Sequence, residues 1–225
     1  MHYSKTSLIS FLLLASSCAP APIKPQEANL ATYRSVQDLV GQYGQVSGKF
    51  ENQYLAYVVE RLTRALPPKE IASAQTQVVL LADPYPLAGT PGRGFILVSK
   101  GLVLRLQNEG ELAFVLAHEM SHQILGHSIS AEQSSSERQE FELEADRHAV
   151  AMIAVAGYDP RVCVGALLHS ADSSAFWETE PKNPDHPALQ ERIEAVRALV
   201  TASRWNPPGT IDRYDFQKLK KSLTY

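Results

Sequence analysis

The sequence predicts an α+β fold that is mostly helical and carries a small sheet. Apolar residues recur with helical spacing in four stretches, residues 51–66, 108–126, 138–154 and 188–203. Two short apolar runs, residues 77–81 and 95–98, predict strands, because turns rich in Pro and Gly separate them. The 225 residues suit a single domain, and a net charge of −3 without any basic run argues against a nucleic-acid partner.

The N-terminus has the features of a targeting segment. Lys5 precedes an apolar run from Leu8 to Ala15, which is far shorter than the ~20 residues of a membrane-spanning helix. The run ends at Ala15-Ser16-Ser17-Cys18, which resembles a bacterial lipobox. We therefore expect a signal peptide over residues 1–17 and diacylation of Cys18. An ordinary signal peptide with an incidental cysteine is the alternative.

The segment that begins at Cys18 predicts a spacer between a membrane and the domain. Its three prolines favour an extended chain of about 3 Å per residue, so residues 18–28 form the predicted tether and residues 29–225 the predicted single domain. Ala19 after the cysteine favours, by analogy, sorting to the outer membrane. We expect a lipid-anchored protein on the periplasmic face of the bacterial outer membrane, with a soluble periplasmic or secreted form as the alternative.

The stretches outside the motif-bearing helices are less informative. Several glycines interrupt residues 30–48, so the pattern there does not decide for or against a helix. Residues 51–66 predict an amphipathic helix that Pro67 stops. Cys163 lies in an apolar stretch and is expected to be a buried small hydrophobe, so no disulfide framework is predicted.

The helix predicted over residues 108–126 carries the motif on which the functional prediction rests. It contains the H-E-x-x-H pentapeptide His118-Glu119-Met120-Ser121-His122. Asn108 and Glu111 give it a capping-box-like start, and Gly126 gives it a stop. Its apolar side chains point in every direction, which predicts a buried helix.

The spacing of this pentapeptide suits a metal site. Residues four apart lie on one helix face, so His118 and His122 can bind one metal ion, while Glu119 is rotated by about 100°. Two imidazoles, an open coordination position and an adjacent carboxylate are the parts of a hydrolytic zinc site. The alternative is a chance match in which both histidines are ordinary core or surface residues.

A third metal ligand is predicted on the helix over residues 138–154. With 100° per residue, Glu142 lies at the centre of an apolar arc, and Asp146 lies about 40° from it. Because a buried carboxylate needs a partner, Glu142 is the predicted ligand. Asp146 is predicted to accept the free N–H of a ligating histidine, and Glu144, at about 200°, to face solvent.

Together these motifs resemble metallopeptidase family forty-eight, the gluzincins that include HtpX-like and CAAX-prenyl-protease-like enzymes. The resemblance runs from about Tyr54 to Val200. Beyond the pentapeptide it rests on three segments, Glu142-Leu-Glu-Ala-Asp146-Arg147, Gly157-Tyr-Asp-Pro160, and His186-Pro187 with Arg192-Ile193. The segment over residues 87–94 departs from the Asn-Ala-Phe-like sequence that family members often carry, so substrate preference is not carried over.

The resemblance implies a zincin-like metallopeptidase domain. One Zn²⁺ per chain would be held by His118, His122 and Glu142, with Glu119 as the general base. His186 matches the family's later His-Pro histidine, and we expect it near this cluster. There it would either support the transition state or bind and block the zinc; an exposed loop histidine is the alternative.

The resemblance further implies an endopeptidase that cleaves extended or unfolded polypeptides in the cell envelope. In such enzymes the edge strand beside the metal takes the substrate as an added antiparallel strand. We expect residues 95–98 to be either that edge strand or a plain core strand.

Two further features of the sequence carry weaker expectations. The polar, Ser-rich residues 128–138 are expected to form a frayed helix or a lid. The three further histidines, His127, His148 and His169, are expected to be surface or satisfied residues.

Two functions from other classes stay open at this point. One is a zinc-binding envelope-assembly or chaperone-like factor that has an occluded, little-used site and works with envelope-assembly partners. The other is a structural lipoprotein with a fortuitous motif. One zinc per chain, lost in His118→Ala, would exclude the structural lipoprotein, and proteolysis that a chelator stops would exclude the assembly factor.

Overall fold

A computed structural model describes residues 30–127, 134–171, 189–202 and 216–224. The predicted signal peptide, Cys18, the tether, His186 and most of the predicted lid lie outside these residues. Residues 134–138 of that segment are described, and they form the start of a helix.

The described residues are mostly helical and include a small three-stranded sheet, which confirms the predicted fold class. In chain order the elements are α1 (Leu30–Tyr43), α2 (Lys49–Arg64), α3 (Pro68–Ile71), β1 (Gln77–Leu81), β2 (Ala88–Gly92), β3 (Phe95–Ser99), α4 (Lys100–Arg105), α5 (Glu109–Leu125), α6 (Ser135–Val155), α7 (Val162–Ser170), α8 (Leu189–Ala202) and α9 (Phe216–Ser222). The helices predicted at α2, α5, α6 and α8 and the strand predicted at β1 are confirmed to within a few residues. No helix in the described part of the chain has the length and apolarity needed to span a bilayer.

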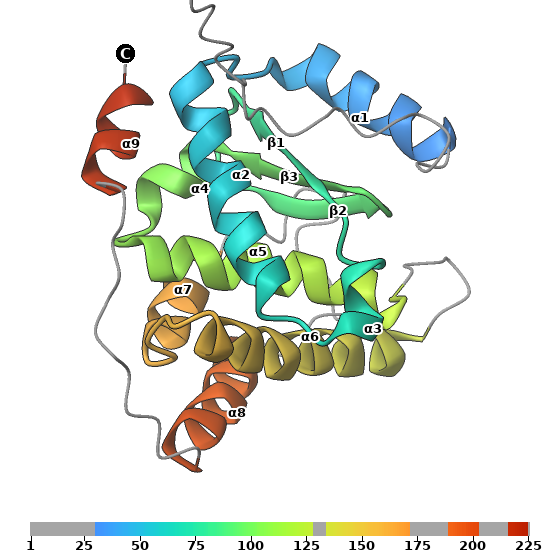
Figure 1. Ribbon diagram of the computed structural model, residues 1–225, viewed down its shortest axis with the longest axis vertical. Helices are drawn as coiled ribbons and strands as arrows, with labels where there is room; N and C mark the ends of the chain where they lie inside the picture. The colour runs from blue at the N-terminus through green and yellow to red at the C-terminus, as the bar shows by residue number, and fades with distance from the viewer. Residues whose placement is uncertain (1–29, 128–133, 172–188, 203–215, 225) are drawn as a thin grey trace, which may run out of the picture.

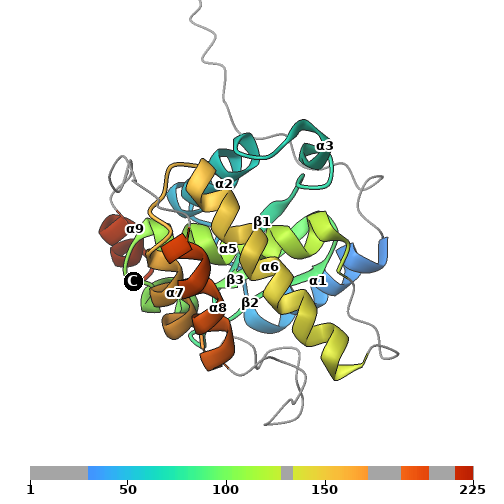
Figure 2. The ribbon, with the colours of Figure 1, turned by 90° about the horizontal axis from the view of Figure 1, so that it is seen from below.

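The elements form layers around the sheet (Figure 1). Helix α1 covers one face of the sheet, and α5 lies on the opposite face, followed by α6 and then α8. Figure 2 shows α6 crossing α5, with α7 and α8 beside it. The H-E-x-x-H pentapeptide therefore lies on a helix enclosed between the sheet and α6.

The order of the strands differs from one of the two expectations for residues 95–98. The sheet has the order β1-β3-β2, so β3 is the central strand and not an edge. Phe95 and Leu97 pack toward α1, whereas Ile96 and Val98 join the larger core around α5. A strand buried on both faces has a continuous apolar run, so the core-strand alternative is correct. The edge strand that flanks α5 is β2 instead.

Strand β2 contains a bulge where it passes α5. It pairs antiparallel with β3 through Ala88↔Val98, Gly89↔Leu97 and Gly92↔Phe95, so Thr90 and Pro91 together oppose a single residue. An extra residue of this kind bends a strand and redirects a side chain. Pro91 has no N–H to donate to a ladder, which suits it to a bulge on an edge strand.

Residues 30–48 are more ordered than their glycines suggest. Helix α1 runs through Gly41 to Tyr43, and the chain then turns at Gly44, whose φ is 73°. Val36 is buried against Val79, Leu81 and other residues of the sheet. Packing against the sheet therefore outweighs the weak local propensity for helix.

Candidate active site

Helix α5 holds the H-E-x-x-H pentapeptide in a fixed place. The Asn108 side chain accepts a hydrogen bond from the Glu111 N–H (3.0 Å), and Gly126 ends the helix in the left-handed region, with φ 75°. Glu111 does not complete a reciprocal capping box, because its carboxylate accepts from the Gln107 N–H instead. The helix is buried along most of its length, so its two neighbouring histidines need polar partners inside the protein.

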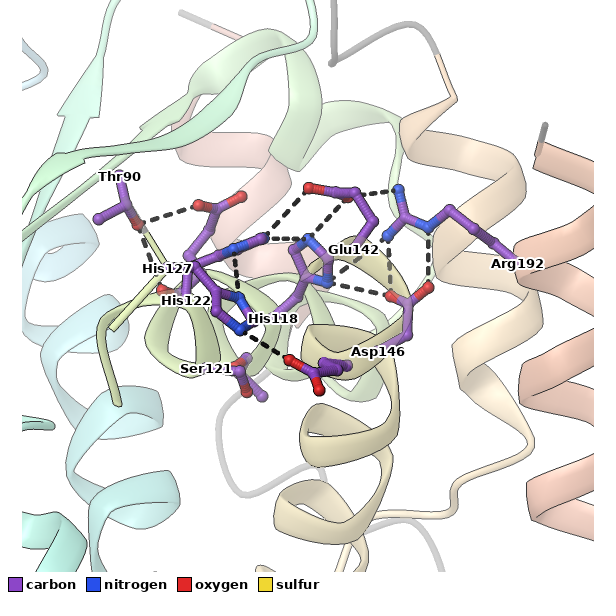
Figure 3. A network of polar contacts seen from close by, with 11 residues as sticks. Thr90, His118, Ser121, His122, His127, Glu142, Asp146 and Arg192 are labelled. Atoms are coloured by element: carbon purple, nitrogen blue, oxygen red, sulfur yellow. Dashed lines mark hydrogen bonds and ion pairs between the residues drawn. The ribbon is translucent and has the colours of Figure 1, made fainter. Parts of the chain in front are cut away.

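The structure brings His118, His122 and Glu142 together, and each can donate one ligand atom to the same metal ion (Figure 3). These three residues are called the donor cluster below. The two histidine Nε2 atoms are 3.1 Å apart. The Glu142 carboxylate lies 3.4 Å from the His118 Nε2 and 3.3 Å from the His122 Nε2. Tetrahedral zinc with bonds of about 2.0–2.1 Å separates its ligand atoms by about 3.3 Å. The donor set therefore fits such an ion both in its chemistry and in its spacing.

The inward face of α6 agrees with the helical phase inferred from the sequence. Glu142 and Asp146 are buried, and the Asp146 Oδ1 lies 3.0 Å from the His118 Nδ1. A carboxylate can only accept, so the His118 Nδ1 donates and its Nε2 is left to face Glu142 and His122. This is the contact predicted for Asp146, and it fixes the ring of His118 with its Nε2 pointing into the cluster.

The cluster favours positive charge. Burial disfavours the charged form of His118, but Glu142 and Asp146 outweigh it and raise the pKa of His118 to about 10. Burial likewise opposes the charged forms of Glu142 and Asp146, but Arg192 first and His118 second hold the pKa of each carboxyl below its usual range. Buried acids on both sides of His118 thus suit the binding of a cation.

Arg192 is a site residue whose role the sequence did not indicate. It projects from α8, donates to both oxygens of Asp146 at 2.8 Å, and lies 3.0 Å from the Glu142 carboxylate (Figure 3). Its planar guanidinium suits this forked contact with one carboxylate. The only sequence signal was its place beside Ile193 in a family motif.

His122 has a partner of its own on the side away from the cluster. Its Nδ1 lies 3.2 Å from the Nδ1 of His127, and the Nε2 of His127 lies 3.1 Å from the Glu144 carboxylate. His127 is thus a satisfied histidine, as expected. Burial, with the charge of His122 as a second cause, lowers the pKa of His127. Glu144 is only partly solvent-facing, since its side chain is 45% exposed and still reaches His127.

Glu119 contacts the edge strand β2. The hydroxyl of Thr90 on β2 lies 3.0 Å from the Glu119 Oε2 and 3.2 Å from the Glu119 carbonyl oxygen. Glu119 is not among the three grouped donors, which leaves its carboxylate available beside them. The bulge of β2 accounts for Thr90 facing α5 at this position.

The remaining described histidines have partners outside the cluster. His148 lies between Ser121 (2.9 Å) and Glu70 (3.2 Å), and His169 lies 2.8 Å from Glu111. The Ser121 set has the residue types of a hydrolytic triad, but Ser121 is fully buried and donates to the Ala117 carbonyl oxygen (2.7 Å). It is therefore a structural contact between α5, α6 and α3.

Two protein-family models match the sequence. The one described as Peptidase family M48 matches residues 49–137, and the one described as Peptidase U49 matches residues 110–207. A comparison with curated proteins found no match. Both family matches include the H-E-x-x-H pentapeptide of α5, and the second also includes α6 and Arg192. The two matches overlap on the helix that supplies both histidines and together extend from α2 to α8, which supports a metallopeptidase of family M48.

Proposed function

We propose that the protein is a zinc-dependent endopeptidase of the gluzincin type that binds one Zn²⁺ through His118, His122 and Glu142. The observation that carries this proposal is the set of three donor separations between 3.1 and 3.4 Å, which match the edges of a tetrahedral zinc site. Three protein ligands leave one position open, which distinguishes a catalytic site from a closed structural one.

The chemistry divides between the metal and the chain. When bound, zinc would supply Lewis-acid chemistry, lowering the pKa of a water molecule toward ~7 and polarising the scissile carbonyl. Glu119 accepts the proton of the attacking water and later delivers it to the leaving amine. Asp146 accepts the Nδ1–H of His118 and so leaves the Nε2 of His118 free to bind the metal, and Arg192 holds Asp146 and Glu142 in place.

The substrate is an extended or unfolded polypeptide added to the free edge of β2. The Leu87 carbonyl oxygen accepts from the Ser99 N–H (2.8 Å), so by alternation Leu87 and Gly89 pair with β3. Ala88 then directs its N–H and C=O away from β3, toward an added strand. Main-chain contacts of this kind give binding with loose side-chain preference.

Zinc content and proteolysis test this proposal together. We expect one zinc per chain, and cleavage of reduced and alkylated lactalbumin, but not of its native disulfide-bonded form, that a chelator stops and added zinc restores. His118→Ala should lose both zinc and activity. Full activity without metal would overturn the proposal. One tightly bound zinc without any cleavage would favour the envelope-assembly factor instead.

The cell-envelope role is a separate part of the proposal. The lipobox-like Ala15-Ser16-Ser17-Cys18 supports anchoring to the outer membrane through Cys18. The resemblance to family forty-eight supports a quality-control role there, among envelope-assembly partners. Cys18→Ser should move the protein from the membrane fraction to the soluble fraction. Continued membrane association of this variant would contradict the lipid anchor.

His186 is proposed to act on this same site, as transition-state support or as a ligand that blocks the zinc. The two roles predict opposite results for His186→Ala. A loss of turnover with unchanged zinc affinity would assign it to the transition state. A gain of turnover would assign it to a gate. Unchanged turnover would exclude both.

A further inference from the structure

The two histidines of the pentapeptide are oriented by different partners. The Nδ1 of His118 faces Asp146, a buried carboxylate that is 1% exposed. Within the residues that the structure describes, the Nδ1 of His122 has no carboxylate as a direct partner and lies 3.2 Å from the Nδ1 of His127. His127 in turn reaches the carboxylate of Glu144 through its Nε2, at 3.1 Å. The set His122–His127–Glu144 therefore takes the place that Asp146 alone occupies for His118.

The direction of each hydrogen bond in this set follows from the Glu144 carboxylate, which lies at the end farthest from the donor cluster. The Glu144 carboxylate can only accept, so the Nε2 of His127 carries the hydrogen. In the neutral ring the Nδ1 of His127 then has a lone pair and accepts from the Nδ1–H of His122. The Nε2 of His122 is left with its lone pair, and this is the atom that lies 3.1 Å from the His118 Nε2 and 3.3 Å from Glu142.

The protein holds His127 firmly in this position. Its side chain is 4% exposed, and its ring stacks on Phe141 with centroids 4.2 Å apart and planes 10° apart. The left-handed turn at Gly126 brings the His127 N–H to within 2.9 Å of the His122 carbonyl oxygen, so the chain folds back on the last turn of α5. Phe141 directly precedes Glu142 in α6. The same helix therefore positions both Glu142 and His127, the partner of His122.

We propose that His127 and Glu144 are positioning residues that orient His122 for the metal, a role that rests on the proposed zinc site. His127 acts on the tautomer and ring angle of His122, and Glu144 acts through His127. Partners of this kind typically affect metal affinity by 10- to 100-fold. Because the Glu144 side chain is 45% exposed, solvent screens its charge, and its effect should be the smaller of the two.

Zinc affinity, measured by competition with a chromophoric chelator, tests the proposal. His127→Ala should weaken affinity by about 10- to 100-fold. His127→Asn places an amide oxygen where the Nδ1 lies, so it should restore most of the affinity, whereas His127→Leu should not. Glu144→Ala should weaken affinity by several-fold, and Glu144→Gln, whose amide oxygen still accepts, by less. Glu140→Ala is the matched control, because Glu140 is an exposed glutamate of α6 that pairs with Arg147.

Two further measurements separate positioning from folding. The absorption bands of the cobalt-substituted protein should shift in His127→Ala and return in His127→Asn. In the His127→Ala background, Glu144→Ala should have no additional effect on affinity, because it acts through His127. If His127→Ala fails to fold, the Asn, Leu and Glu144 variants decide the same question.

The outcome is separable from that of the proposed function. Wild-type affinity and an unchanged cobalt spectrum in the His127 variants, or an equal loss in Asn and Ala, would overturn the positioning role while leaving the zinc peptidase intact. Failure of the wild-type chain to bind zinc would instead overturn the proposed function.

Discussion

The Thr90 hydroxyl of the edge strand β2 lies 3.0 Å from the Glu119 carboxylate of α5. A residue of the strand proposed to receive the substrate therefore touches the proposed general base. The contact depends on the bulge in β2, which places two residues opposite one of β3. Binding geometry and base position are thus linked through one side chain.

Thr90→Val should slow turnover without affecting the metal. Removing one hydrogen bond to a charged group should lower kcat by about 10-fold, the equivalent of about 1.4 kcal/mol in the barrier. Zinc affinity should stay within about twofold of wild type, on the order of experimental scatter, because Thr90 touches none of the three donors. Thr90→Ser, which keeps the hydroxyl, should recover most of the activity, and Thr63→Val on α2 is the control. Equal turnover in the Val and Ser variants would show that the contact has no part in catalysis.

Glu119→Gln should separate metal binding from catalysis. Glu119 is not one of the three grouped donors, so zinc should remain bound at one per chain. Turnover should fall by the 10²- to 10⁴-fold that is typical of losing a general base. Zinc content by atomic absorption and single-turnover cleavage of an unfolded substrate measure the two effects. Near-normal turnover would remove Glu119 from the mechanism.

The parts of the site that the sequence predicted are those set by local periodicity. Glu142 and Asp146 lie inward on α6 because burial follows the 3.6-residue repeat, which a single sequence displays directly. Strand β2 was missed because Ala88-Gly-Thr-Pro-Gly92 has little propensity for a strand and exists as one through its pairing with β3. Arg192 was given no role because its partner Asp146 is 46 residues away on another helix. Contacts of that range arise only from the tertiary packing of α8 on α6.

Glu142→Ala should abolish tight zinc binding, since it removes one of the three proposed protein ligands. The loss should exceed the 10- to 100-fold expected for an orienting partner, which distinguishes it from Glu144→Ala. Chelator competition on the two purified variants gives the comparison. If Glu144→Ala loses the metal while Glu142→Ala keeps it, the ligand assignment is wrong.

Glu109→Ala should show the opposite pattern, a loss of stability with the metal site retained. The Glu109 carboxylate is buried and accepts from the hydroxyls of Tyr54 (2.6 Å) and Tyr158 (2.8 Å), and Arg61 lies 3.6 Å away. Removing this carboxylate deprives buried polar partners of their acceptor and should lower the free energy of unfolding by about 3–5 kcal/mol. Urea denaturation measures this cost, and zinc titration of the folded fraction should give near-wild-type affinity. A loss of affinity without a loss of stability would place Glu109 in the metal site.

Cys163 should report on unfolding and, through it, on metal binding. It is fully buried on α7, and burial, with Asp146 as a second cause, raises the pKa of its thiol well above the usual range. Because the thiolate is the reactive form, native protein carrying Cys18→Ser should resist a thiol reagent at pH 8 and react only on unfolding. Zinc binds the folded state, so saturating zinc should slow labelling in this background but not when Glu142→Ala is added. Rapid labelling of the native, zinc-loaded protein would mean that α7 opens locally, independently of the metal site.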